Sequence, residues 1–251
     1  MVNINATIIT VRNSSSRLPN KPLLKIKNNL RSIDIVIERA KQIGLPVILA
    51  TSTSTNDDIF ESISKEHKIN FFRGSLLNKI KRWYDCFLKF DIENALLVDG
   101  DDLCYSYEIG KRAINQLIST NCDIILPSSQ IVTGFFTYAI SKTGISKIYK
   151  IVQNENTNTD VITLFIEKAN LTKSSIELNK IECNQNIRLT LDYDEDLQFF
   201  RKLYSHLDTL ENGSNIVNFL SKNKEIVQIN FNKQKDFLTN QSKFNEDMLN
   251  E

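Results

Sequence analysis

The stretch ATIITV, residues 6–11, runs directly into the polar stretch RNSSSRLPNKP, residues 12–22. The first stretch is short, apolar and rich in β-branched side chains, a composition that predicts a buried strand. The second stretch interleaves three cations with three serine hydroxyls and predicts a loop. The chain therefore begins with a strand that opens into a polar loop, and functional groups often lie on such loops.

Helical and strand patterns alternate after this loop. Ile33, Ile37 and Ala40 recur at helical spacing, and the apolar stretch 46–50 follows as a second strand. The strand, helix and strand form a βαβ unit, and its repetition predicts an α/β fold with a mostly parallel sheet flanked by helices on both faces. The next elements that we expect are helices at about 57–67, 76–90 and 108–119 and strands at 69–72, 95–98 and 122–126.

The alternation weakens between residues 127 and 186, where we expect antiparallel strands and an inserted dimerisation or lid subregion. No linker rich in Pro, Gly or Ser and no block of charge divides the chain. We therefore expect one domain over residues 1–231 and a polar C-terminal tail over residues 232–251. The elements that we expect after residue 186 are strands at 187–191 and 225–229 and helices at about 195–206 and 216–221.

The composition excludes several classes of protein. The chain has 251 residues, of which 41% are hydrophobic and 24% charged, as in ordinary globular proteins. Lys and Arg (31) nearly balance Asp and Glu (30), so the chain lacks the basic excess with which proteins bind nucleic acid. No apolar run approaches the roughly 20 residues that a membrane-spanning helix needs. The N-terminus also lacks the basic-then-apolar pattern of a secretion signal. We expect a cytoplasmic protein without nucleic acid or membrane partners.

The loop after the first strand is the first candidate site, because ligands of open α/β sheets lie beyond the carboxyl ends of the strands. Arg12 and Arg17 can each bind phosphate oxygens through two N–H groups, and Lys21 adds a mobile charge. The serine hydroxyls supply further donors. This set suits a triphosphate, although a solvated basic loop without a ligand stays open as the alternative. The chain has seven glycines and neither a Walker motif nor a GxGxxG motif.

Two further strand ends carry clustered acids. Asp99, Asp101 and Asp102 follow the strand at 95–98, and a divalent cation such as Mg²⁺ would relieve their mutual repulsion. An acidic turn that caps the next helix is the alternative. Asp192 and Asp194 follow the strand at 187–191; helix capping explains Asp194 but not Asp192. If the three loops converge, cations meet a triphosphate and carboxylates meet magnesium, as nucleotidyl transfer requires.

The helix expected at 76–90 also carries cations next to aromatic residues. Ile80, Trp83, Tyr84 and Phe87 recur at helical spacing, which predicts a core face beside a charged face. We therefore retain only Arg82 of this helix as a candidate ligand contact.

The first loop resembles a family signature in its spacing, Arg12-x-x-Ser15-x-Arg17-Leu18-Pro19-x-Lys21-Pro22-Leu23. The family comprises the cytidylyltransferases that activate 3-deoxy sugar acids: the CMP-Kdo and CMP-sialate synthetases and the spore coat polysaccharide biosynthesis protein F branch. The resemblance runs from about residue 6 to residue 230. Further similar segments follow in the family's order: Ala50-Thr51-Ser52, Asp57-Asp58, Phe72-Arg73-Gly74-Ser75, Arg82, Gly100-Asp101, Ile187-Arg188-Leu189-Thr190-Leu191-Asp192, Glu195-Asp196-Leu197 and Ile229-Asn230.

This resemblance implies a Rossmann-like nucleotide-diphospho-sugar transferase fold. It implies that CMP is transferred from CTP to a small sugar acid (Kdo-, sialic- or legionaminic-like) or related acceptor, with release of pyrophosphate, for surface polysaccharide biosynthesis. It also implies a homodimer that requires Mg²⁺. The residues that it implies are Arg12, Lys21 and Asp101 for catalysis; Arg12, Ser15, Arg17, Lys21, Thr51, Arg73, Arg82 and Asp99 for the nucleotide; Gly134 and Tyr138 for the acceptor; and Asp101, Asp192 and Asp194 for the metal.

The chain departs from the family pattern at a few positions. Leu103 stands where the family has proline, and Asp99 replaces a frequent glutamine, which leaves the base preference open. Residues 132–138, where the family contacts the acceptor, include no arginine or histidine for a substrate carboxylate. Two other functions stay open. One is a GT-A-type glycosyltransferase, since Asp99-Gly100-Asp101 matches a DxD pattern, and the other is a catalytically silent nucleotide-binding homologue.

Overall fold

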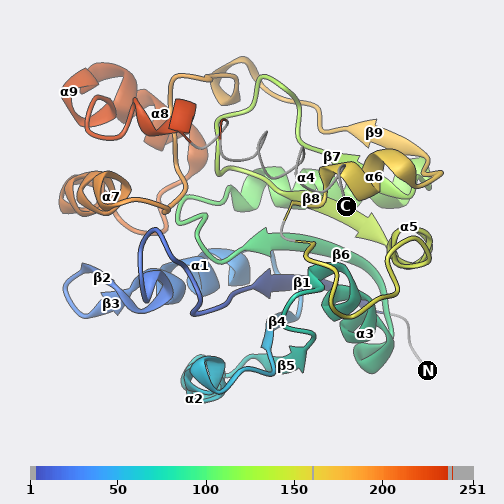
Figure 1. The fold of residues 1–251 in the computed structure, drawn as a ribbon. Coiled ribbons are helices and arrows are strands. Elements are labelled where there is room, and N and C mark those ends of the chain that lie inside the picture. The colour runs from blue at the N-terminus through green and yellow to red at the C-terminus, as the bar shows by residue number, and fades with distance from the viewer. Residues whose placement is uncertain (1–3, 160, 237–238, 240–251) are drawn as a thin grey trace.

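The computed structural model describes residues 4–159, 161–236 and 239, so most of the expected tail lies outside the described residues. Seven strands form one sheet in the order β5-β4-β1-β6-β8-β7-β9 (Figure 1). Only β8 runs antiparallel to its neighbours β6 and β7, which confirms the predicted mostly parallel sheet. The strands are β1 (Ile4–Thr10), β4 (Val47–Ser52), β5 (Asn70–Gly74), β6 (Ile92–Asp99), β7 (Ile124–Leu126), β8 (Tyr138–Ser141) and β9 (Lys173–Ser175), and a separate hairpin pairs β2 (Lys25–Lys27) with β3 (Leu30–Arg31).

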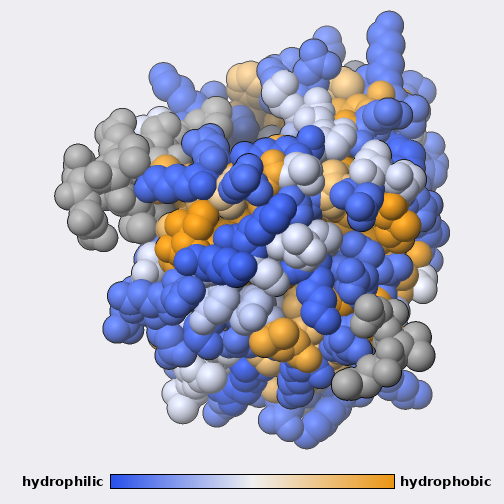
Figure 2. All heavy atoms as spheres, turned by 90° about the vertical axis from the view of Figure 1, so that its right-hand side faces the viewer, coloured by the Kyte–Doolittle hydropathy of each residue, from blue (hydrophilic) through white to orange (hydrophobic). Residues whose placement is uncertain are grey.

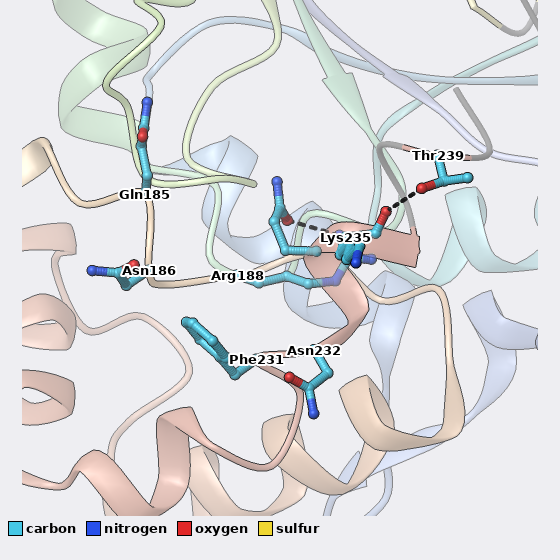
Figure 3. A pocket seen from close by; sticks show the side chains of 8 residues that line it. Gln185, Asn186, Arg188, Phe231, Asn232, Lys235 and Thr239 are labelled. Atoms are coloured by element: carbon cyan, nitrogen blue, oxygen red, sulfur yellow. Dashed lines mark hydrogen bonds between the residues drawn. The ribbon is translucent and has the colours of Figure 1, made fainter. Parts of the chain in front are cut away.

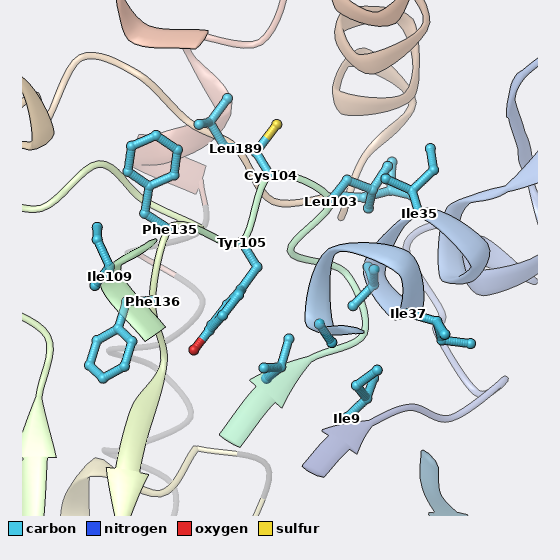
Figure 4. Close-up of a cluster of buried hydrophobic side chains, with 14 of the residues drawn as sticks. Ile9, Ile35, Ile37, Leu103, Cys104, Tyr105, Ile109, Phe135, Phe136 and Leu189 are labelled. Atoms are coloured by element: carbon cyan, nitrogen blue, oxygen red, sulfur yellow. The ribbon is translucent and has the colours of Figure 1, made fainter. Parts of the chain in front are cut away.

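Helices cover both faces of this sheet, as predicted. Side chains of a strand alternate between the two faces, so Ile9 of β1 joins one buried cluster and Ile8 joins another. The Ile9 cluster includes α1, α4, α7 and α8 and is drawn in part in Figure 4. The Ile8 cluster includes α3, α5 and α6. The helices are α1 (Ser32–Lys41), α2 (Ile59–Glu66), α3 (Lys79–Phe90), α4 (Tyr107–Thr120), α5 (Lys142–Tyr149), α6 (Thr163–Lys168), α7 (Asp194–His206), α8 (Gly213–Lys222) and α9 (Lys224–Val227).

Two predicted strands are wrong. Residues 187–191 are extended, but they join the sheet by no ladder; their one bridge pairs Arg188 with Thr133. The Leu191 N–H instead donates to the Asp101 carbonyl, so this segment crosses the loops at the carboxyl end of the sheet. Residues 225–229, expected as the last strand, overlap helix α9, which packs on α7 and α8. Helix α9 buries Ile226. The short apolar pattern of this segment is compatible with a helix as well as with a strand.

The surface of the described chain is mixed in polarity. No helix among these residues combines the length and the apolar composition that crossing a bilayer requires. Figure 2 shows the side of the molecule that carries α5, where hydrophilic side chains dominate and apolar side chains form separate patches. Single exposed apolar side chains such as Leu88 and Ile151 are normal on the surface of a globular protein.

His67, at the end of α2, should make the stability of the fold depend on pH. Its ring nitrogens lie 2.9 Å from Asp34 Oδ1 and 2.8 Å from Glu38 Oε1. The pKa of His67 is raised above its usual value, chiefly by the hydrogen bond with Asp34. Burial alone would lower this pKa, and Glu38 raises it further. Stability from the charged ring is therefore complete below the pKa of an unfolded histidine, about 6.5, and is lost as pH rises through the raised pKa.

We therefore expect H67Q to have a lower free energy of unfolding than the wild type at about pH 6, and the difference to shrink towards about pH 9. Urea unfolding at a series of pH values measures it. The matched control is H206Q, which changes the other histidine of the chain, a residue that packs on Phe219. A difference for H67Q that stays constant with pH would contradict the prediction.

Candidate functional site

The three predicted loops converge on one cleft of about 1140 Å³. It lies beyond the carboxyl ends of β1 and β6, which point to the same side of the sheet (Figure 1). The loop after β1, the tip of β6, and residues from 127–138 and 190–192 all contribute to its lining. Residues far apart in sequence thus share one site, as the positions of the first two loops after β1 and β6 predict.

Lys21 lies at the centre of the cleft and joins the loops. Its Nζ lies 2.5 Å from Asp101 Oδ2 and 3.0 Å from Asp192 Oδ1. Burial by itself would lower the pKa of the Lys21 ammonium, but Asp101 and Asp192 outweigh that effect and hold this pKa well above its usual value. Lys21 is therefore charged at neutral pH and is available to a phosphate.

Asp192 lies among cations. Arg17 Nη2 is 2.9 Å from its Oδ1, and Arg188 Nη2 is 2.8 Å from its Oδ2. Burial would raise the pKa of the Asp192 carboxyl, but the surrounding cations, Lys21 foremost, lower this pKa below its usual value. Asp192 is therefore an ionised carboxylate at the point where the loops meet. This position accounts for Asp192, which helix capping does not explain.

Arg188 orients Asp192 from behind the cleft. Its guanidinium also binds Asp196 at 3.1 Å, and Asp196 accepts the backbone N–H groups of Asp192 and Tyr193. Asn230 donates to the same Asp196 carboxylate. The other side of Arg188 faces a second hollow of about 590 Å³ (Figure 3). Asp192 is thus held by a buried network that centres on Asp196 of α7.

The tip of β6 brings three carboxylates together. Oxygens of Asp99, Asp101 and Asp102 lie within 4.8 Å of one another. Burial foremost, and then the charges of Asp101 and Asp99, raise the pKa of the Asp102 carboxyl well above its usual value. Clustered carboxylate oxygens that repel one another are the donor set that Mg²⁺ prefers. The residues present therefore fit a magnesium ion.

Most of the predicted nucleotide residues line the cleft: Arg12, Ser15, Arg17, Lys21, Arg82 and Asp99 do so. Three predicted residues lie outside its lining. Thr51 is buried and donates to the Val11 carbonyl. Arg73 forms an ion pair with Asp58 and donates to the backbone carbonyls of Ser52 and Ser54. Asp194, a predicted metal ligand, is exposed on the first turn of α7. The structure therefore brings Asp101 and Asp192 together without Asp194.

Sequence reasoning did not select Lys79 or Arg188. Ile80, Trp83 and Phe87 are buried, as predicted, but Lys79 at the start of α3 lines the cleft and lies 2.7 Å from Asp99. The available signal was its position on the first turn of a helix at the carboxyl edge of the sheet.

Gly134 and Tyr138, the predicted acceptor residues, line the cleft. Gly134 has φ +89°, and a Cβ there would lie 2.3 Å from the Leu189 carbonyl oxygen. We expect G134A to lower the free energy of unfolding by at least about 2 kcal/mol, because it adds a backbone clash to left-handed strain. G44A is the matched control, since Gly44 has φ +87° and its Cβ would meet no described atom within 4 Å.

Urea unfolding measures both variants, and G44A should cost only about 1 kcal/mol. Equal losses for G134A and G44A would show that the contact between residues 134 and 189 is not close in solution.

The sheet order and this cleft are those of the nucleotide-diphospho-sugar transferase fold, which similar solved structures share. A model of the cytidylyltransferase family matches residues 6–244. The chain therefore belongs to the cytidylyltransferase family, which confirms the resemblance predicted from its first loop.

Three relatives illustrate the similarity. The uncharacterised protein MJ1063 of Methanocaldococcus jannaschii is 27% identical over 235 residues, which cover 92% of this chain and 96% of that protein. A cytidylyltransferase from Leptospira borgpetersenii has a similar structure, with a TM-score of 0.81, 20% identity, and coverage of 90% of this chain and 98% of that one. A CMP:2-keto-3-deoxy-manno-octonic acid synthetase complexed with CTP has a TM-score of 0.65 and 16% identity, over 81% of this chain and 99% of that one. The two solved structures support the fold.

Proposed function

We propose that this chain is a magnesium-dependent cytidylyltransferase that transfers CMP from CTP to a hydroxyl of a small sugar acid or related acceptor and releases pyrophosphate, for surface polysaccharide biosynthesis. The observation that carries the proposal is Lys21, which lies within hydrogen-bonding distance of both Asp101 and Asp192. A lysine between two carboxylates, beside a loop with two arginines, supports phosphate binding and metal binding at neighbouring positions. Membership of the family supports CTP as the nucleotide.

The cationic loop would bind the triphosphate. Arg17 has a partly exposed side chain that contacts Asp192, and Arg12 donates to the Leu76 carbonyl at 2.7 Å. Both guanidiniums line the cleft with Ser15 and can donate to phosphate oxygens. Lys21, next to Asp101, would stabilise the charge that develops on the α-phosphate and on the leaving pyrophosphate.

Asp101 and Asp192 would hold the magnesium ion, with Asp99 and Asp102 beside Asp101. Bound there, the ion supplies neutralisation of phosphate charge and acidifies the attacking hydroxyl. The chain's own part is to keep Asp192 ionised through Lys21, Arg17 and Arg188 and to hold Asp101 at the tip of β6.

The acceptor would enter along the side of the cleft that holds Gly134 and Tyr138. Its hydroxyl oxygen forms a bond to the α-phosphorus, the bond to the pyrophosphate oxygen breaks, and the hydroxyl proton leaves to solvent. The reaction is a direct displacement and requires no nucleophile from the protein. We also propose that the protein acts as a cytoplasmic homodimer, a state that the sequence resemblance implies.

The test is pyrophosphate release from CTP and Mg²⁺ in the presence of a panel of sugar acids, with mass-spectrometric detection of the CMP-linked product. We expect release that depends on the acceptor and is lost in D101N. If the protein instead transferred sugar from a nucleotide sugar, the DxD pattern at 99–101 would indicate a glycosyltransferase. If it bound CTP without turnover of any acceptor, the proposal of catalysis would fail and a silent homologue would remain.

A further inference from the structure

Lys79 and Asp99 form an ion pair inside the cleft, apart from the contacts of Lys21. Lys79 Nζ lies 2.7 Å from Asp99 Oδ1, and both residues line the cleft. The Lys79 side chain is 12% exposed and the Asp99 side chain 32% exposed. The pair is therefore shielded from bulk water and still accessible to a ligand in the cleft.

Buried residues next to the cleft hold this pair in place. The Lys79 ammonium lies 4.9 Å from the centre of the Trp83 ring, a distance at which cation–π attraction operates. Trp83 is itself buried, and its indole N–H donates to Thr10 Oγ1 at 2.7 Å. Thr10 and Asp99 are register partners on β1 and β6. Lys79 is therefore oriented by the same two strands that carry the site.

The pair retains unused hydrogen-bonding capacity. Within the described part of the chain, Asp99 Oδ1 accepts from Lys79 and no hydrogen bond reaches Asp99 Oδ2. An ammonium has three N–H groups, and among the same residues Lys79 uses one of them in a hydrogen bond. One acceptor oxygen and additional donors thus lie side by side, a combination that suits a hydroxyl group, which both donates and accepts.

We propose that the Lys79–Asp99 pair binds a ribose hydroxyl of the nucleotide and selects ribonucleotides over deoxynucleotides. This inference rests on the proposed function and extends it to a pair of specificity-determining residues. Asp99 Oδ2 accepts from the hydroxyl, and Lys79 keeps the Asp99 carboxylate oriented and donates to the hydroxyl oxygen.

The spacing within the site favours the ribose over the other parts of the nucleotide. A carboxylate oxygen of Asp99 lies within 4.8 Å of one of Asp101, where the proposed function places the α-phosphate. The ribose is joined to the α-phosphate through one ester oxygen, whereas the base lies beyond the ribose. The β- and γ-phosphates are assigned by the proposed function to the cations of the first loop, Arg12 and Arg17, and not to Asp99. The group that reaches Asp99 from Asp101 is therefore the ribose.

The test compares the Kd of CTP with those of 2′-deoxy-CTP and 3′-deoxy-CTP by calorimetry in the presence of Mg²⁺. In the wild type, one of the two deoxy analogues should bind about 10- to 100-fold more weakly than CTP, as expected for a lost hydrogen bond to a charged group. In D99A, this ratio should fall below about threefold, because the partner of the hydroxyl is gone. K79M should reduce the ratio as well, and K79R should restore part of it.

The controls are K81M and D85N, which break a 2.6 Å ion pair on the same helix outside the lining of the cleft. Both should keep the wild-type ratio. If the deoxy penalties are the same in the wild type and in D99A, the inference is overturned while CTP binding, and with it the proposed function, stands. If no nucleoside triphosphate binds the wild type, the proposed function fails and the inference fails with it.

Discussion

Replacing Lys21 with methionine should lower kcat/KM for CTP by about 1,000-fold, the size of loss that follows removal of one preorganised group facing transition-state charge. Methionine keeps most of the length of the side chain and removes its charge. Lys21 is the group that contacts both Asp101 and Asp192, so the variant leaves two carboxylates facing the position where we place the phosphates. The substrate's own negative charge would then be repelled instead of bound.

This loss should come from the chemistry more than from the fold. Asp192 keeps Arg17 and Arg188 as partners in K21M, and the Asp101 side chain is 23% exposed, so water can solvate it. We therefore expect K21M to remain folded by circular dichroism and to lose turnover. K21R should recover part of the activity, because a cation returns with a different shape.

Pyrophosphate release under subsaturating CTP measures the effect. The matched control is K25M, because Lys25 is exposed and its ammonium contacts Asn29 outside the lining of the cleft. K25M should keep its activity within about twofold of wild type, as surface changes usually do. Turnover of K21M within about tenfold of wild type would remove Lys21 from the catalytic role.

The fold could be predicted where the hydrophobic pattern admits one interpretation. The apolar stretch at 6–11 forms β1 because it is short, β-branched and buried on both faces. At residues 187–191 the same kind of pattern gives extended chain without a ladder. Periodicity reports burial and backbone direction, but pairing depends on which edge of the sheet is free. Residues 225–229 show a second ambiguity, between helix and strand. The segment buries Ile226 in a short helix, and a strand with the same apolar pattern could bury it as well.

The site could be predicted in outline for a related reason. The loop that carries Lys21 follows β1 and Asp101 follows β6, and neighbouring parallel strands end at the same edge, so their meeting follows from topology. Asp192 reaches that edge for another reason, because residues 187–191 cross it without joining the sheet. The direction of an individual side chain does not follow. Asp194 is two residues from Asp192, yet it points to solvent from the first turn of α7. Lys79 enters the cleft because Trp83 and Asp99 direct it there, and both contacts are tertiary.

Replacing Arg188 with methionine should lower the free energy of unfolding by about 3–5 kcal/mol, the range found when one partner of a buried ion pair is removed. The Arg188 side chain is 2% exposed, and its partners Asp192 and Asp196 are 4% and 0% exposed. Asp192 keeps Lys21 as a partner. Asp196 loses its cation and keeps backbone N–H groups and Asn230 as donors.

The main cost of R188M is therefore the uncompensated charge of Asp196, and a second substitution can separate this cause from lost packing. R188M combined with D196N should be more stable than R188M alone by at least about 1 kcal/mol, because asparagine has nearly the same shape and no charge to leave unpaired. R201M serves as the control for loss of an exposed guanidinium, whose Nε donates to the Lys25 carbonyl, and should cost less than about 1 kcal/mol. Urea unfolding of the four proteins gives the comparison. If the double variant were no more stable than R188M, packing around residue 188, and not the charge of Asp196, would hold this side of the site together.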